Sequence, residues 1–356
     1  MDDVRDKVEL IIAGRAYGGW TDVEIDYGID SIAHQFTLSL TERGEGGAQE
    51  LPVEAGSECR VTIGGETVIT GYVDAINASV DSQNHGITAS GRSKAADLID
   101  CSAIGTPSSW SNRKFEAIAA DLVKPLGISI VARSDTGAPF AKFAVQTGES
   151  VFEALERMAK LRSLLLISTS AGAVEIVTPT PKGAAIRLVQ GQHFKAITGR
   201  HDVSQRFSQY LIKGQSAGSD SVNGKAAAHV KASATDPAIE RYRPLMIVAE
   251  DQANAASMSA RAKWEATVRA AKAQGADVTL PTWRDPTGQL WQPMQRVRLV
   301  SQWVNIDADL LITNVSLRLS QDESTATLTL AYPDAYSQMP VPPEARPSKI
   351  KKAKPQ

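Results

Sequence analysis

Short runs of alternating apolar and polar residues are the feature that most constrains the fold of this chain. The segments 20–27, 34–40 and 324–332 each alternate with a period of two. Such a period places every second side chain on one face of an extended strand, which predicts half-buried β-strands. Gly64 and Gly65 separate two further runs and predict a tight hairpin, because glycine readily adopts the positive φ of such turns. The chain is therefore expected to be rich in sheet.

Helical patterns interrupt the strands in the middle of the chain and again near residue 250. The segment 112–126 has helical periodicity, with Asn112 placed as its N-cap. Ser150 and Glu153 form a capping-box motif that predicts the start of a second helix. A third helix is expected over 251–274. The order is therefore β, then α+β, then β with a helix-containing excursion.

The two ends of the chain differ in character. Six or seven strands are expected before residue 95, a number that suggests a small barrel or a sandwich. Residues 336–356 contain five prolines and a lysine cluster, and have almost nothing to bury. This last segment is expected to be disordered.

Composition excludes several broad classes of protein. Hydrophobic residues make up 42% and charged residues 22% of the chain, as in folded globular proteins, and the net charge is −2. No specific nucleic-acid binding is expected from such a charge. The apolar runs 10–13 and 164–168 are far too short for a signal-peptide core or a membrane span. No stable membrane insertion is expected.

A search for reactive or metal-binding motifs finds none with the required spacing. Cys59 and Cys101 form no CxxC pair and are expected to be free thiols in a reducing cytoplasm. No GxSxG motif is present, and the histidines form neither HxH nor HxxxH. They are expected on the surface or on strand faces: His34, His85, His193, His201 and His229. No metal, cofactor or catalytic residue is predicted.

One enzymatic alternative stays open, a peptidoglycan hydrolase with an unrecognised carboxylate site in the α+β part. Glycoside hydrolysis requires two carboxyl groups across a cleft. Five carboxylates in this region were considered: Asp97, Asp100, Asp121, Glu153 and Glu156. Their pattern is more typical of solvated charge than of a buried pair with shifted pKa values.

Two aromatic-containing segments have a structural and a functional interpretation. In Arg241-Tyr242-Arg243, two arginines flank a tyrosine before a proline, and they could bind carboxylates of a partner or simply face solvent. Trp283 and Trp291 bracket a polar turn, where they could pack or serve an interface. The sequence does not decide between these interpretations.

Five short sequence motifs carry a family resemblance, because they occur in the order and at the intervals that the family shows. They are 19–23 (GWTDV), 71–74 (GYVD), 91–101 (GRSKAADLIDC), 241–247 (RYRPLMI) and 288–293 (GQLWQP). Together they make the chain similar, from about residue 8 to about residue 333, to the baseplate hub protein of Mu-like contractile phages, the tail protein P family. The hub of T4-type phages and the hub domain of type VI secretion spikes share that family's architecture.

The resemblance implies an α+β, β-rich fold that contains two small β-barrel "tube" domains. The implied parts are a first tube domain at 1–95, an α+β domain at 96–182, a second tube domain at 183–335 with an insertion at about 216–275, and a disordered tail at 336–356. Three copies would form a ring that adapts the sixfold tail tube to the threefold spike. A fused lysozyme domain, found in some other hubs, has no room in this chain.

The resemblance also implies partners, location and sites. The partners would be two further copies of the chain, the central spike protein, the tail tube protein, other baseplate proteins and, as a further candidate, the tape measure protein. The protein would be made in the host bacterial cytoplasm and act in the virion tail baseplate, without enzymatic activity, during tail assembly and genome ejection. The family-motif positions are interface candidates: Gly19, Trp20, Gly71, Tyr72, Asp74, Gly91, Arg92, Arg241, Tyr242, Arg243 and Trp291.

Overall fold

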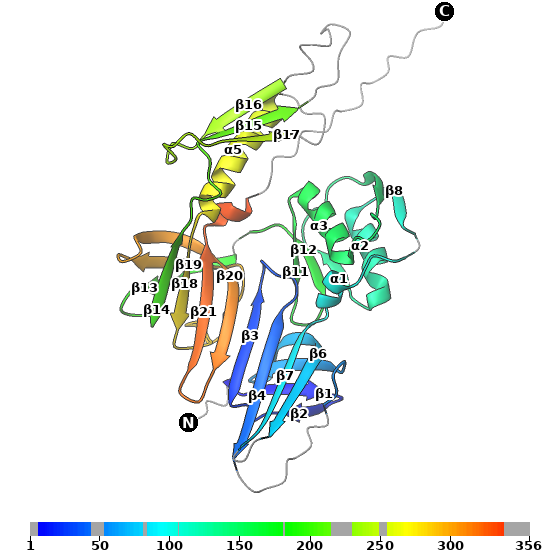
Figure 1. Cartoon of the computed structure of the whole chain (residues 1–356), viewed down its shortest axis with the longest axis vertical. Coiled ribbons are helices and arrows are strands. Elements are labelled where there is room, and N and C mark those ends of the chain that lie inside the picture. The colour runs from blue at the N-terminus through cyan, green and yellow to red at the C-terminus, as the bar shows by residue number, and fades with distance from the viewer. Residues whose placement is uncertain are drawn as a thin grey trace, which may run out of the picture. The chain divides into compact units, whose positions relative to one another are not determined.

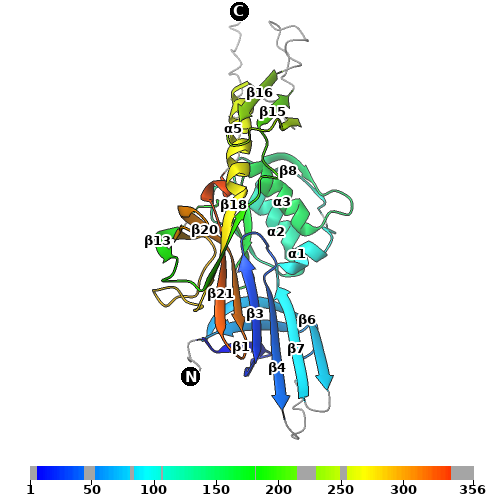
Figure 2. The ribbon, with the colours of Figure 1, turned by 60° about the vertical axis from the view of Figure 1, so that its left-hand side comes forward.

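The computed structural model describes residues 6–43, 53–80, 84–105, 107–180, 182–214, 230–248 and 255–337. The chain divides into two compact units. Unit 1 consists of Met1–Val203 and Ala271–Gln338, and unit 2 consists of Ser204–Ala270 and Met339–Gln356. Unit 1 is rich in strand, whereas unit 2 combines a small sheet with a helix (Figures 1 and 2).

The largest element of unit 1 is a thirteen-stranded sheet built from both ends of the sequence. Its strands are β1 (Val8–Ile12), β2 (Arg15–Tyr17), β3 (Asp22–Gly28), β4 (Gln35–Arg43), β5 (Glu58–Ile63), β6 (Glu66–Val80), β7 (Asn84–Ser93), β13 (Lys182–Val189), β14 (Ala196–His201), β18 (Gln274–Leu280), β19 (Gln295–Ser301), β20 (Ile306–Leu319) and β21 (Ser324–Ala331). The main path is β14-β18-β21-β20-β3-β4-β7-β6-β5-β1-β2, and β13 joins β20 through β19.

The alternating sequence pattern explains why these segments are strands. In β3, Val23, Ile25 and Tyr27 are buried in the main core while the residues between them are partly exposed. Each strand thus places one face on apolar neighbours. The predicted hairpin is confirmed, because Gly64 and Gly65 have positive φ and join β5 to β6.

One strand pair connects the first β region to the last. β3 runs antiparallel to β20, from Val23 opposite Leu319 to Gly28 opposite Asn314. Gly28 allows the two backbones to approach, because a Cβ there would lie 2.5 Å from the backbone oxygen of Thr313. The two β regions therefore belong to one continuous sheet.

The α+β, β-rich class is confirmed, whereas the expected barrels are not. Along the main path the described strands leave β14 and β2 at opposite ends without a pairing between them. Closure into a barrel requires the first and last strands to pair. The described part of the chain is thus β-rich, and its large sheet is open.

The α+β part of unit 1 spans the middle of the sequence and has its own core. Its elements are α1 (Ala96–Asp100), β8 (Ser109–Arg113), α2 (Phe115–Val123), the 3₁₀ helix η2 (Lys124–Leu126), β9 (Ile130–Ala132), β10 (Phe140–Ala144), α3 (Val151–Arg162), β11 (Leu165–Ser168) and β12 (Val174–Val177). The helices α2 and α3 lie side by side in both ribbon views (Figures 1 and 2). Phe115, Leu155 and Met158 are fully buried in the core that they share.

The ends of the two main helices test the predicted caps. Ser150 accepts a hydrogen bond from the Glu153 backbone, and Glu153 accepts one from the Ser150 backbone, so the capping box is confirmed. The N-cap assigned to Asn112 is wrong. Asn112 lies at the end of β8 with φ of 51°, and α2 begins three residues later after Lys114. Strand pairing of β8 with β10 delays the helix.

Unit 2 is a three-stranded sheet with one long helix. Its elements are β15 (Gln209–Gly214), β16 (Val230–Thr235), β17 (Pro244–Val248) and α5 (Ala255–Lys272), whose last two residues belong to unit 1. The strand order is β16-β15-β17. Ile212 of the central strand packs on Met258 and Ala262 of the helix. Arg206 and Asp236 form a buried bidentate ion pair with both distances at 2.9 Å.

The predicted tail begins where the described chain ends. A short 3₁₀ helix, η3 (Pro333–Tyr336), follows the last strand, and the Tyr336 hydroxyl donates a hydrogen bond to Asp30. The disorder expected for the tail concerns mainly residues 338–356, which lie outside the described residues.

Candidate functional site

Two of the family motifs, 71–74 and 91–101, lie beside each other because β6 and β7 are paired. Gly71 is opposite Ser93, and Gly91 is opposite Val73. A Cβ on Gly71 would lie 1.8 Å from the backbone oxygen of Arg92, and one on Gly91 would lie 2.1 Å from that of Tyr72. Real Cβ atoms cannot approach so closely, so glycine is required at both positions.

Arg92 holds the end of this strand pair to the first helix of the α+β part. Its Nε donates to Asp74 at 2.6 Å, and its Nη2 donates to Asp100 at 2.8 Å. Asp74 lies at a β-bulge in β6, and Asp100 ends α1. Hydrogen bonds to Asp100 and Asp74 raise the pKa of the Arg92 guanidinium. The arrangement is a charged joint between the first β region and the α+β part.

Lys94 and Tyr72 extend this joint along the same strands. The Lys94 ammonium lies 2.5 Å from Glu58 on β5 and 5.9 Å from the centre of the Tyr72 ring. The hydrogen bond to Glu58 raises the pKa of Lys94. Tyr72 and Lys94 therefore form a half-buried cation–π contact, which contributes modestly to stability.

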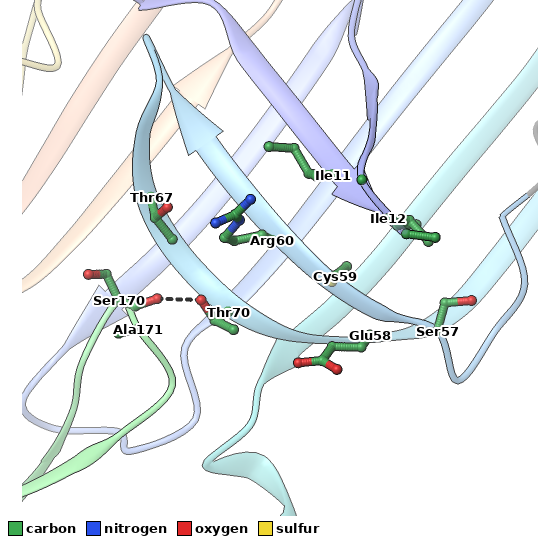
Figure 3. Close-up of a pocket in the computed structure, with 12 residues that line it drawn as sticks. Ile11, Ile12, Ser57, Glu58, Cys59, Arg60, Thr67, Thr70, Ser170 and Ala171 are labelled. Atoms are coloured by element: carbon green, nitrogen blue, oxygen red, sulfur yellow. Dashed lines mark hydrogen bonds between the residues drawn. The ribbon is translucent and has the colours of Figure 1, made fainter. Parts of the chain in front are cut away.

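Next to this joint, the sheet surface is hollowed. Figure 3 shows the hollow of about 700 Å³, lined by residues of β1, β5, β6 and the β11–β12 turn. Ile11, Arg60 and Thr70 lie opposite one another across three strands. The Thr70 hydroxyl donates to the backbone oxygen of Ser170 at 2.8 Å, which ties the turn to β6.

The polar groups of the hollow do not form a catalytic arrangement. Burial raises the pKa of the Cys59 thiol to about 12, so the thiol stays protonated and unreactive near neutral pH. Glu58 is already paired with Lys94. Cys59 and Cys101 are both free, as expected. Among the described lining residues, the thiol and the carboxylate are therefore protonated and ion-paired, respectively.

The remaining family positions of unit 1 are packing residues. Gly19 has φ of 83° at the turn before β3, and the buried Trp20 indole donates to the Tyr17 backbone oxygen at 3.2 Å. The sequence left open whether Trp283 and Trp291 pack or serve an interface, and both are packed in the core, with exposed fractions of 1% and 2%. Trp283 donates to the backbone of Thr325, closing the turn onto the sheet core.

The three residues 241–243 differ from one another in their surroundings. Arg243 is half-buried and held to unit 2, where its Nη2 donates to the Ser204 backbone oxygen at 2.8 Å and its guanidinium lies 5.0 Å from the Phe207 ring centre. Tyr242, in contrast, is 83% exposed, and Arg241 is exposed beside it. The sequence could not separate the anchored arginine from the free one.

The carboxylates considered for hydrolysis are mostly engaged in structural contacts. Glu153 completes the capping box, and Asp121 accepts from the Trp110 indole at 2.9 Å. Burial, and then the neighbouring Asp100, raise the pKa of Asp97. Asp100 is held by Arg92, and Glu156 pairs with Lys160 at 2.8 Å. Neither Asp97 nor Asp100 lines the hollow of Figure 3.

His34 was expected on the surface or on a strand face, and it lies directly before β4 as a buried residue. Its exposed fraction is 6%, its Nε2 lies 3.2 Å from the Gly28 backbone oxygen, and burial lowers its pKa to about 4. It lines a cavity of about 260 Å³ with Ser168. The alternation of the strand could have predicted this burial, because His34 is two residues before the buried Phe36 and four before the buried Leu38.

Metal binding and membrane spanning each require a recognisable structural feature. Within the described ranges, no group of three or more His, Cys, Asp or Glu residues is arranged to hold a metal ion. No helix in the described part of the chain is long and apolar enough to span a bilayer.

Family models match consecutive parts of the chain. The Mu phage baseplate assembly protein GpP-like N-terminal model matches residues 7–93, and the baseplate hub protein gp44-like second-domain model matches 95–178. The tail protein NMB1110-like third-domain model matches 206–264, and the Mu phage baseplate assembly protein GpP fourth-domain model matches 254–339.

Whole-chain relatives agree with these models. Baseplate hub protein gp44 of Escherichia phage Mu is 32% identical over 328 residues, covering 90% of this chain and 86% of that protein. The 43 kDa tail protein of prophage MuSo2 from Shewanella oneidensis is 34% identical, with a TM-score of 0.84 over 94% of this chain and 100% of that one. A type VI secretion component of E. coli, described as similar to T4 tail proteins gp27 and gp5, shares the fold at a TM-score of 0.56 and 10% identity, over 93% and 79% of the two chains. This chain therefore belongs to the family of baseplate hub proteins of Mu-like phages.

Proposed function

We propose that three copies of this chain form the ring at the centre of a contractile-tail baseplate and adapt the sixfold tail tube to the threefold central spike. Each copy contributes two tube-type β regions, so that the ring offers six positions to the tube. The same ring contacts the spike on its other side. Closure of each β region into a barrel is part of this proposal.

The observation that carries the proposal is the pairing of β3 with β20. It joins strands from the first and last thirds of the sequence into one continuous sheet of unit 1. One subunit therefore presents two strand-rich regions as one body, which is the property that a threefold ring needs to match a sixfold tube.

The mechanism in this proposal is mechanical. The ring caps the tube, holds the spike and starts tube assembly, and on contraction it moves with the spike toward the host envelope before the genome passes. Its partners are two further copies, the spike protein, the tail tube protein, other baseplate proteins and, as a candidate, the tape measure protein. It acts in the virion after synthesis in the bacterial cytoplasm, and it performs no covalent chemistry.

The alternative, a peptidoglycan hydrolase, has no specific observation in its favour. Of its five candidate carboxylates, Asp121, Glu153 and Glu156 already make structural contacts, and Asp100 is paired with Arg92. A hydrolase needs one such group free to protonate a leaving oxygen and another free to attack or to activate water.

Light scattering after size-exclusion chromatography tests the assembly. The expected mass is three times the chain's 38.1 kDa, with co-elution when the spike protein is added. A strict monomer at micromolar concentration, with and without spike protein, would contradict the proposal. Cell-wall degradation that is abolished by Asp97→Asn would favour the hydrolase instead.

A further inference from the structure

The sheet of unit 2 has one covered face and one uncovered face. On the covered face, α5 packs on Ile212, Ala232, Ala234 and Ile247. Strand residues alternate between faces, so Leu211 and Met246, which lie opposite each other in β15 and β17, belong to the other face. Val248 and Lys213 form the next pair on that same face.

The uncovered face and its edge concentrate exposed apolar side chains. Met246 is 54% exposed, Val248 is 72% exposed, and Tyr242, two residues before the strand begins, is 83% exposed. Single exposed apolar residues are ordinary, but three within seven residues of sequence, on an edge strand and directly before it, are not. Tyrosine, methionine and arginine are also the residues that protein interfaces favour.

The same surface carries three exposed cations. Lys213 and Lys231 are opposite each other on β15 and β16 and are exposed, and so is Arg241. None of these three has an ion pair or hydrogen bond to a side chain within the parts of unit 2 that are described. We call the surface formed by Leu211, Lys213, Lys231, Arg241, Tyr242, Met246 and Val248 the basic apolar face.

The segment 204–270 of unit 2 differs in charge from the chain as a whole. Residues 204–270 contain nine Lys and Arg against six Asp and Glu, a formal charge of +3, whereas the whole chain has −2. Two of its described acids are buried and already form ion pairs. Asp236 pairs with Arg206, and Glu265 pairs with Arg261 and Arg269. Glu240 is the exposed acid among the described residues of unit 2. Within the described residues of unit 2, the surface cations therefore outnumber the surface acids.

We propose that the basic apolar face docks an extended acidic segment of a partner protein, with apolar side chains between its carboxylates. Arg241 and the two lysines would pair with the carboxylates, while Met246, Val248 and Tyr242 would cover the intervening apolar groups. Anchoring of Arg243 on Ser204 and Phe207 fixes the backbone from which Arg241 and Tyr242 project. The proposal goes beyond the trimeric adaptor and does not depend on it.

The chemistry favours a protein over the other anionic partners. A nucleic-acid surface usually neutralises many phosphates, whereas this face offers three cations. Helices that bind membrane surfaces use a long amphipathic stripe, whereas the apolar stripe of α5 is already packed against the sheet. A protein–protein interface typically combines apolar side chains with a few charges, as this face does.

The test uses the full chain and a defined probe. The probe is a fluorescent capped peptide of about ten residues in which Glu alternates with Val and Phe, and its control carries Lys in place of every Glu. We expect saturable binding of the acidic peptide by anisotropy, weakened by salt, and no binding of the lysine peptide. Lys213→Glu combined with Lys231→Glu should lower affinity at least tenfold, and Met246→Asp should do the same.

Matched controls carry the same changes in unit 1. Arg15→Glu with Arg60→Glu reverses two exposed charges, and Val131→Asp replaces a 39% exposed apolar residue. Both should bind like the parent chain, with circular dichroism verifying the fold of every variant. Equal loss in the control variants, equal binding of both peptides, or preferential binding of phosphatidylglycerol vesicles or single-stranded DNA overturns the proposal. A trimer that fails this test leaves the proposed hub function standing.

Discussion

At the scale of single residues, the positions that identify the family are explained mainly by backbone approach and by charge pairing. Gly71 and Gly91 permit a strand contact that any side chain would prevent, and Arg92 joins that contact to α1. Sequence reasoning could select these positions but could not assign their roles. The partner of Arg92, Asp100, became visible only when the strand and the helix were placed together.

Gly71→Ala is expected to destabilise unit 1 by about 3 kcal/mol or more, because a methyl group would overlap the Arg92 carbonyl. Urea unfolding followed by tryptophan fluorescence measures the change. Gly105→Ala is the control, since nothing lies within 4 Å of its added Cβ, and it should change stability by less than about 0.5 kcal/mol. Similar effects of the two substitutions would refute the close-contact explanation.

His34 predicts a pH dependence of stability. Its pKa falls from the ordinary 6.5 to about 4 on folding, so the unfolded chain binds the proton more tightly. The free energy of unfolding is therefore unaffected above pH 6.5 and decreases as the pH falls toward 4. The decrease between pH 7.5 and 5 should be about 2 kcal/mol, measured by urea titration at each pH.

Two substitutions isolate this effect. His34→Gln removes the titrating group and should flatten the pH profile, whatever its effect on absolute stability. His193→Gln changes a histidine exposed near the end of β13 and should keep the parental profile. An unchanged profile in His34→Gln would show that other groups govern the acid response.

At the scale of elements, local sequence signals were reliable where they specify their own hydrogen bonds. The capping box of α3 and the Gly64-Gly65 hairpin are both present. The start of α2 was missed because tertiary strand pairing extends β8 through Arg113. Periodicity alone cannot detect such competition between a strand and a helix end.

Ser150→Ala removes the side chain that accepts from the Glu153 backbone, leaving that donor unsatisfied. The expected cost is about 1 kcal/mol in chemical denaturation. Ser111→Ala, at an exposed position of β8, serves as the control and should be nearly neutral. No cost for Ser150→Ala would indicate that water replaces the cap without penalty.

In unit 2, Arg206→Ala leaves the carboxylate of Asp236 buried without its ion-pair partner. The expected loss is about 3–5 kcal/mol, visible as faster hydrogen exchange across residues 204–214 and 230–248. Lys160→Ala breaks an exposed pair with Glu156 and should cost less than about 0.5 kcal/mol. Unchanged exchange in Arg206→Ala would mean that the pair does not stabilise the unit.

At the scale of the whole molecule, the sequence predicted the β-rich class but not the continuity of the sheet. Strand alternation shows which residues are buried, yet it does not choose between partners. The pairing of Val23 with Leu319 joins positions almost a chain length apart, and no local pattern encodes it. The start of unit 2 at Ser204 was likewise hidden, because β15 alternates just as the strands of the large sheet do.

The most direct test of the central claim is electron cryomicroscopy of the purified chain bound to tail tube protein. We expect a threefold ring in which each subunit contributes two β regions, giving six similar positions that face the tube. A monomer on the tube end, a ring of another symmetry, or a ring in which each subunit offers a single β region to the tube would contradict it.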